Sequence, residues 1–144
     1  MKFDFSALNF ETLDPQVNAY PDIFVNVNGV TFTKKVVEDL GYPAYVRCML
    51  DAKARVFAVR MCKSNEPRGF KFSKPRGEQK TTINLTSKNV IDPIRAAMAD
   101  TWDAKKRYRV RGFWVADEKT MCFDLSEGVQ EDFRGSGADG DSEE

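Results

Sequence analysis

Residues 23–43 read IFVNVNGVTFTKKVVEDLGYP and predict the start of regular structure in this chain. Apolar and polar side chains alternate over residues 23–32, as they do on a half-buried strand. In the middle of this alternation stand Asn28 and Gly29, two residue types that readily adopt positive φ in tight turns. The stretch therefore predicts a β-hairpin that turns at Asn28-Gly29.

A short helix is predicted directly after this hairpin, over residues 34–40. Thr33 belongs to the residue types that favour the N-cap position, and Gly41 can take the left-handed conformation that ends a helix. Pro43 follows two residues later, where it prevents the helix from continuing. Two strands and a helix in immediate succession are typical of a mixed α+β fold.

The rest of the chain predicts two further hairpins, a linker and a second helix. In chain order we expect strands over 45–50 and 55–61, a linker over 63–80 with a short edge strand at 70–72, a strand over 82–86, a helix from Ser87 to about residue 99, and strands over 108–115 and 120–125. Pro93 lies six residues after Ser87, so the true start of this helix is expected nearer Asp92.

The order strand, helix, hairpin occurs twice, which predicts an α+β fold of two β-α-β-β units in a pseudo-duplicated, β-barrel-like domain. The predicted boundaries are an N-terminal docking arm at 1–22, one domain at 23–126 with pseudo-repeats at 30–61 and 82–125 and the linker at 63–80, and an acidic tail at 127–144. The arm carries aromatic side chains that we expect to dock on the domain. The tail is too polar to repay its ordering entropy and is expected to be disordered.

Charge is sorted along the chain, although the formal net charge is +0 at pH 7. Residues 34–111 hold 19 Lys/Arg and 8 Asp/Glu, whereas residues 1–33 hold 1 and 4, and residues 112–144 hold 2 and 10. A basic body with acidic flanks is typical of a polyanion-binding surface, one that an acidic tail can cover. The expected partner is a nucleic acid, DNA rather than RNA, or an acidic protein surface.

Arginines alternate along the predicted strand at residues 107–111. Side chains two residues apart on a strand share one face at intervals of roughly 7 Å, a spacing similar to that of phosphates along a DNA strand. The candidate nucleic-acid contacts on this segment are Lys105, Lys106, Arg107, Arg109 and Arg111. The alternative is a solvated face on which cross-strand carboxylates, for example Glu118 or Asp124, neutralise the arginines.

The linker at 63–80 is the second basic cluster. Its cations are Lys63, Arg68, Lys71, Lys74, Arg76 and Lys80. Phe70 and Phe72 stand among them, and aromatic side chains among cations stack on unpaired bases in proteins that bind single strands. The alternative is a basic loop that these two phenylalanines pin to the core.

Several classes of function are excluded or disfavoured by composition. The chain has no histidine, so catalytic triads built on histidine and the commonest metal ligand are absent. Neither G-x-x-x-x-G-K-[ST] nor G-x-G-x-x-G occurs, and Cys48, Cys62 and Cys122 form no C-x-x-C pair, so they are expected to be buried thiols. We predict no catalytic, cofactor-binding or metal-binding residues and a non-enzymatic protein.

No apolar run approaches the roughly 20 residues that a membrane helix needs. The first residues also lack the basic and then apolar order of a secretory signal. We therefore expect a cytoplasmic protein without a membrane partner.

Residues 30–43, VTFTKKVVEDLGYP, followed by a predicted hairpin, resemble the strand, short helix, glycine turn and strand pair of AbrB-type swapped-hairpin regulators. Members of that superfamily similar to MraZ carry two such units in tandem, which suits the two halves predicted here. The resemblance implies a compact β-rich barrel that presents Arg and Lys to DNA, commonly as a homo-oligomer.

The expected function is that of a non-enzymatic, DNA-binding regulatory protein that uses its basic central surface. The alternative is a protein–protein adaptor or inhibitor of the kind that phages and mobile elements encode. In that alternative the same cations receive an acidic partner surface, without nucleic-acid contact.

Overall fold

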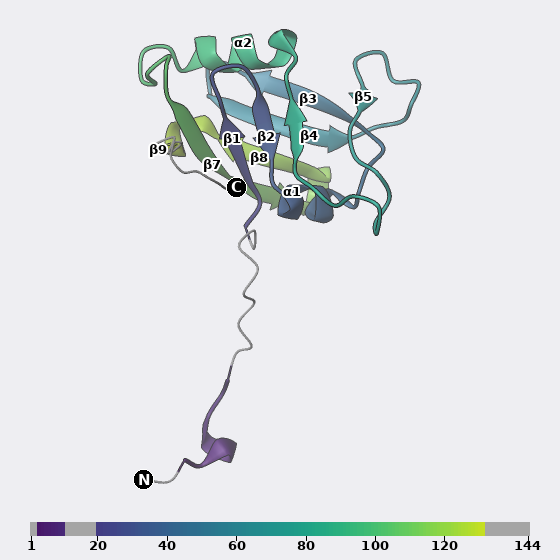
Figure 1. Ribbon diagram of the computed structural model, residues 1–144, viewed down its shortest axis with the longest axis vertical. Coiled ribbons are helices and arrows are strands. Elements are labelled where there is room, and N and C mark those ends of the chain that lie inside the picture. Colours follow the sequence, from purple (N-terminus) through teal and green to yellow (C-terminus); the bar gives the residue numbers. More distant parts are fainter. Residues whose placement is uncertain (1–2, 11–19, 132–144) are drawn as a thin grey trace.

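The computed structural model describes residues 3–10 and 20–131, which form a mixed α+β fold (Figure 1). The strands are β1 (Asp22–Val25), β2 (Val30–Phe32), β3 (Tyr45–Asp51), β4 (Val56–Met61), β5 (Phe70–Lys71), β6 (Ile83–Leu85), β7 (Arg107–Val115), β8 (Thr120–Asp124) and β9 (Val129–Glu131). The α-helices are α1 (Lys34–Leu40) and α2 (Lys88–Ala97), and short 3-10 helices span Phe5–Ala7, Ala116–Glu118 and Leu125–Glu127.

The strands form one antiparallel sheet in the order β5-β3-β4-β8-β7-β1-β2-β6, and β9 pairs with the first part of β7. The sheet curls, so that β1, β2 and β6 lie in front of β3, β4 and β8, with α2 and α1 at opposite ends (Figure 1). Phe32 of β2 lies 6.5 Å, centroid to centroid, from Phe57 of β4, although three strands separate β2 from β4 in the sheet. The core therefore fills the inside of a half-barrel.

The predicted hairpin at the start of the fold is confirmed, but its turn is not the predicted one. β1 pairs with β2 in the register Val25↔Val30, and a four-residue loop is closed by the Asn26 N–H, which donates to the Gly29 carbonyl at 2.8 Å. Neither Asn28 nor Gly29 has positive φ. Glycine is required at residue 29 for a different reason, because a Cβ there would lie 2.8 Å from the carbonyl oxygen of Leu85 in β6.

The first helix is confirmed over the predicted residues, with Thr33 at its N-cap and Gly41 ending it at φ +86°. The Thr33 hydroxyl makes no capping hydrogen bond. It accepts from the Asp22 N–H at 3.1 Å and donates to the Tyr20 carbonyl at 3.1 Å. The residue thus fixes the start of β1 rather than the start of the helix.

The second helix begins at Lys88 with Ser87 as its N-cap, so the start proposed near Asp92 is wrong. Pro93 lies inside α2, on its exposed face, while Ile91 and Ile94 are buried. A proline at this position removes the hydrogen bond to the carbonyl of Asn89. Asn89 is exposed, and water can satisfy the freed carbonyl there.

The predicted boundary of the tail is wrong for residues 127–131. Leu125–Glu127 form a 3-10 turn, and β9 pairs with β7 through Arg107↔Glu131 and Arg109↔Val129. Opposite charges across the two strands favour this pairing, which composition alone does not reveal. Residues 132–144 lie outside the described residues.

The N-terminal arm predicted over residues 1–22 is described at residues 3–10 and 20–22, and its last residue, Asp22, belongs to β1. Phe3, Phe5 and Phe10 are 69%, 71% and 70% exposed, so the docking expected of these side chains is not seen. Residues 11–19 lie outside the described residues. None of the described helices has the length and apolar character of a membrane span.

Candidate nucleic-acid interface

The three arginines of β7 share one outward face, as predicted. Tyr108 and Val110, which alternate with them, are buried on the opposite face of the strand. This arginine face, defined by Arg107, Arg109 and Arg111, is half-buried rather than fully exposed.

Two carboxylates neutralise part of the arginine face. Asp22 of β1 lies across from Arg111 and accepts from its Nε at 2.6 Å, and it also lies 3.9 Å from Nη1 of Arg109. Glu131 of β9 accepts from the Nε of Arg109 at 2.9 Å, and this hydrogen bond raises the pKa of the arginine. The alternative interpretation, in which cross-strand carboxylates neutralise the arginines, therefore holds for Arg109 and Arg111.

The carboxylates that the sequence suggested for this role lie elsewhere. Glu118 pairs with Arg60 at 3.0 Å, and Asp124 accepts from the N–H and hydroxyl of Ser126. The actual partners come from strands that are neighbours of β7 only in the folded sheet. Nothing in the local sequence pattern could have identified them.

Aromatic rings lie beneath the two outer members of the arginine face. The guanidinium carbon of Arg107 is 4.3 Å from the ring centroid of Phe24, and that of Arg111 is 4.0 Å from the ring centroid of Tyr20. Both rings belong to the segment that contains β1. These contacts hold the guanidinium groups close to the sheet.

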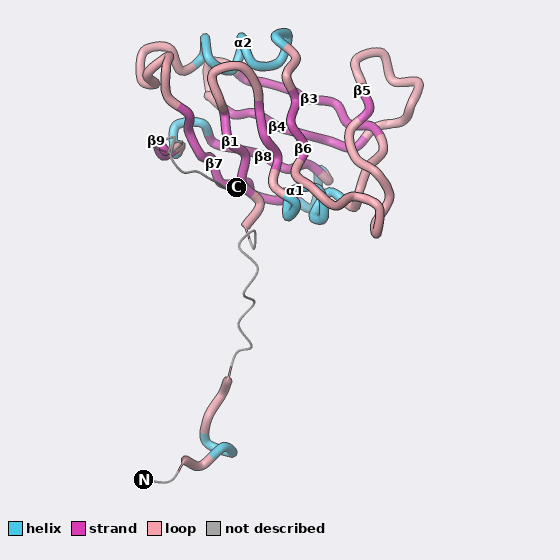
Figure 2. Tube along the Cα trace, viewed as in Figure 1, coloured by secondary structure: helices cyan, strands magenta, loops and turns pink. Residues whose placement is uncertain are grey.

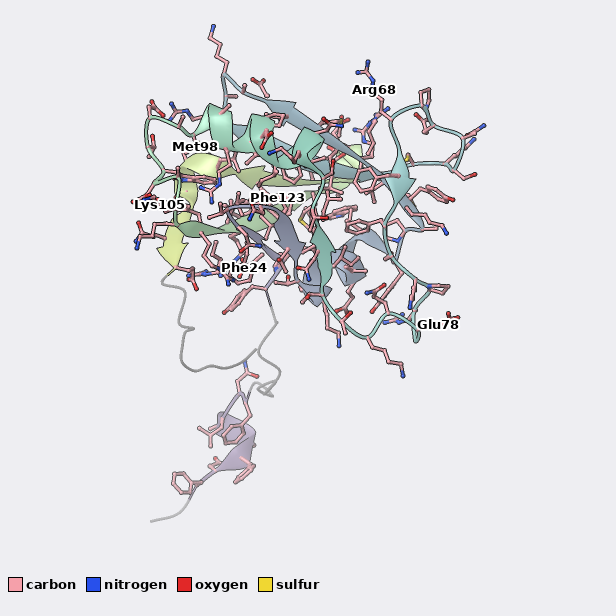
Figure 3. The ribbon with its side chains drawn as sticks, turned by 45° about the horizontal axis from the view of Figure 1, so that its top comes forward. Phe24, Arg68, Glu78, Met98, Lys105 and Phe123 are labelled. Carbon is pink, nitrogen blue, oxygen red and sulfur yellow. The ribbon has the colours of Figure 1, made fainter. Side chains whose placement is uncertain are left out.

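An open groove of about 870 Å³ begins where the arginine face ends. One wall, the cation wall, consists of Lys105, Lys106 and Arg107, with Glu131 beside them. The rest of the lining, called the amide wall, comes from the β1–β2 loop, β2 and β6. It carries the polar residues Asn26, Asn28, Thr31, Asn84 and Thr86 and, between them, Val27, Gly29, Val30 and Leu85. Figure 3 shows Lys105 at this edge of the molecule, on the loop that follows α2.

A chain of hydrogen bonds orients the amide wall. The Asn26 side-chain amide donates to the Thr31 hydroxyl at 3.0 Å, and that hydroxyl donates to the Asn84 side-chain oxygen at 2.6 Å. With these bonds made, the side-chain oxygen of Asn26 and the NH₂ group of Asn84 have no partner among the described residues. The wall therefore offers an acceptor at one end and donors at the other.

Arg95 of α2 joins the two walls of the groove. It donates to the Asn26 carbonyl at 3.2 Å, to the Asp103 carbonyl at 3.3 Å and to the carbonyl of Lys106. Burial lowers the pKa of this guanidinium, and Tyr108 and Asp103 oppose that shift. Sequence reasoning missed Arg95, because a single arginine on an amphipathic helix carries no signal of such a role.

The cations of the linker lie on a different part of the molecule. Figure 3 places Arg68 and Glu78 on the side opposite Lys105, and β5 is separated from β7 by three strands. The cations Lys63, Arg68, Lys71, Lys74, Arg76 and Lys80, called the loop cluster below, are all exposed. The structure does not bring the loop cluster beside the cation wall.

The two phenylalanines of the linker pack against the core. Figure 2 shows the connection between β4 and β6 as mostly loop, interrupted by β5. Phe70 and Phe72 are half-buried against the core, and Phe72 makes an edge-to-face contact with Phe32 at 5.1 Å. These two side chains anchor the loop to the core, in agreement with the alternative interpretation of the linker. They do not form an exposed surface on which bases could stack.

The cysteines are free thiols of intermediate exposure. Burial raises the pKa of Cys48 to about 12 and also raises that of Cys122. Within residues 3–10 and 20–131, no group of three or more Cys, Asp or Glu side chains is arranged to hold a metal ion.

Comparison with known proteins gives no relative of this chain: no family model, no curated protein and no solved structure matches it.

Proposed function

We propose that this protein is a non-enzymatic nucleic-acid-binding protein, with DNA as its ligand, and that the groove is its primary contact. One observation carries the proposal: Lys105 and Lys106 are exposed side by side on the cation wall and form no ion pair within the described residues. Arg109 and Arg111, in contrast, have carboxylate partners. The groove therefore holds two exposed positive charges that no carboxylate compensates within the described residues, and such charges attract phosphates.

The size of the electrostatic contribution follows from counterion release. Two phosphates neutralised by Lys105 and Lys106 correspond to a slope of log affinity against log salt of about −1.8 on duplex DNA, or about −1.4 on a single strand. The exposed loop cluster adds weaker contacts for a ligand long enough to reach it.

Fluorescence anisotropy with labelled oligonucleotides tests the proposal. We expect the double variant Lys105→Glu/Lys106→Glu to bind at least about 10-fold more weakly at low salt, with a salt slope nearer zero by about 1.5 to 2. The matched control is Lys34→Glu/Lys53→Glu, which changes the same charge at exposed positions outside the groove. Absence of binding by the wild-type chain at low salt refutes the proposal, as does an equal loss in both double variants.

A second candidate function is the adaptor or inhibitor. It is favoured by the apolar end of β7, where Phe113 and Trp114 are 63% and 42% exposed beyond the last residue that pairs with β1. Affinity capture from the host, with and without nuclease, separates the two functions. A partner that survives nuclease and is lost with Phe113→Ser, but is retained by Lys105→Glu/Lys106→Glu, supports the adaptor.

We further propose that the two β-α-β-β units are related by duplication, in keeping with the resemblance to tandem swapped-hairpin regulators. The order β2-α1-β3-β4 recurs as β6-α2-β7-β8. Like members also pair with each other, β4 with β8 and β2 with β6, both antiparallel, as an internal two-fold axis requires. An experimental structure in which residues 30–61 superpose on residues 82–125, strand on strand, tests this.

A further inference from the structure

We infer that the groove takes single-stranded nucleic acid, with phosphates on the cation wall and the edges of unpaired bases on the amide wall. The inference rests on the proposed function and names its substrate class. It depends on three features of the groove: its concave shape, its two chemically different walls, and the guanidinium group beside it.

The shape of the groove favours a single strand. A hollow of about 870 Å³ lies within the range of small-ligand sites, roughly 300 to 1,000 Å³. It has room for a few nucleotides but not for a double helix. Because a duplex recesses its base edges in its own grooves, it can contact the rim of this hollow but cannot present bases between the walls.

The two walls match the two parts of a nucleotide. Lysine and arginine bind phosphate, whereas asparagine side chains bind base edges that offer both donors and acceptors. The hydrogen-bond chain through Thr31 leaves the Asn26 oxygen as an acceptor and the Asn84 NH₂ group as a donor. An unpaired base exposes such complementary groups on its Watson–Crick edge, which a duplex base pair has already used.

Arg107 lies between the proposed phosphate contacts and the proposed base contacts of the groove. It lines the groove, and its guanidinium group lies against the ring of Phe24 at 4.3 Å. Unpaired bases stack on the planes of arginine guanidinium groups as well as on aromatic rings. The Arg107 guanidinium, whose carbon lies 4.3 Å from the centroid of the Phe24 ring, is therefore a suitable stacking partner for a base that enters the groove.

The test compares 12-nucleotide homopolymers of dA, dC and dT with a duplex of the same length, by anisotropy at low salt with the full chain. We expect at least one single strand to bind about 10-fold more tightly than the duplex. Asn84→Ala should weaken single-strand binding about 5-fold, to a different extent for each homopolymer, and leave the salt slope unchanged. Lys105→Glu/Lys106→Glu should instead bring the slope nearer zero for all of them.

The control variant is Asn89→Ala, which removes an exposed amide on α2 that does not line the groove. Circular dichroism establishes that each variant is folded before binding is measured. Duplex binding equal to or tighter than that of every single strand overturns the inference and leaves the proposed function standing. An equal effect of Asn84→Ala and Asn89→Ala overturns it in the same way. Failure of all these nucleic acids to bind overturns both proposals.

Discussion

The cation wall and the loop cluster are both dense in lysine and arginine, yet the fold treats them differently. Lys105, Lys106 and Arg107 line one groove together with the amide wall, on a segment whose backbone carbonyls accept hydrogen bonds from Arg95. The loop cluster is exposed on a segment held by Phe70 and Phe72, and none of its cations lines the groove. Charge density therefore does not define a site; a charged segment becomes one when the fold sets complementary groups against it.

The arginine face shows the opposite outcome for a basic segment. Its spacing suits a row of phosphates, but Asp22 pairs with Arg111 and Glu131 pairs with Arg109. Such pairs support the pairing of β7 with β1 and with β9 and reduce the local field. The most regular basic pattern in the sequence is thus the one that the structure compensates most.

The largest effect on stability is expected from a substitution that loosens the loop at residues 63–80 and leaves the groove unchanged. Phe72→Ala removes a half-buried ring from its contact with Phe32 and should lower the free energy of unfolding by about 3 kcal/mol. Urea denaturation measures this loss, and limited trypsin digestion should cleave within residues 63–80. Oligonucleotide affinity at a temperature where the variant is folded should stay within about 2-fold. A large loss of affinity would mean that the loop cluster belongs to the site. Phe113→Ala, at an exposed position, is the control.

The second-largest effect is expected from a substitution that alters the groove and leaves the loop at residues 63–80 unchanged. Arg95→Met removes the hydrogen bonds from the guanidinium group to the carbonyls of Asn26, Asp103 and Lys106, and should lower the free energy of unfolding by about 2 kcal/mol. Because the two walls lose their connection, single-strand affinity should fall about 10-fold or more. Arg68→Met removes a cation from the loop cluster as the matched control. Equal affinities of the two variants would contradict the role of Arg95 as a positioning residue.

A smaller effect is expected where the amide wall meets β6. Gly29→Ala places a Cβ against the backbone of Leu85, so the β1–β2 loop must shift, at a cost of about 1.5 kcal/mol. Thermal unfolding measures the stability, and anisotropy should show weaker single-strand binding at an unchanged salt slope. A variant that binds as the wild type does would show that the amide wall tolerates displacement.

The smallest effect is expected on the arginine face, when the charge of one of its carboxylate partners is removed. Asp22→Asn removes one carboxylate charge from Arg109 and Arg111, and should lower the free energy of unfolding by about 1 kcal/mol. The uncovered charge should strengthen oligonucleotide binding about 2-fold at low salt and leave it unchanged at high salt. Weaker binding at low salt would mean that the carboxylate orders the arginines for the ligand rather than competing with it.

Sequence reasoning succeeded where neighbours along the chain determine the structure. The hairpin β1–β2, the helix α1 with Gly41 at its end, and the hairpins β3–β4 and β7–β8 were all predicted from local pattern. It was wrong at the Asn28-Gly29 turn, where Leu85 from another strand imposes the requirement for glycine. It was also wrong at residues 127–131, because pairing with β7 orders a segment whose composition favours disorder.

The sequence by itself determined which residues of β7 face outward, since side chains alternate on any strand, and where positive charge accumulates along the chain. Only the tertiary structure decided that Asp22 and Glu131 pair with Arg111 and Arg109, that Asn26 and Asn84 line the same groove as Lys105, and that the loop cluster lies apart from this groove. The physical reason is the curl of the sheet. Residues distant in sequence become neighbours through strand register, and register depends on the whole hydrophobic pattern of the core rather than on any single segment.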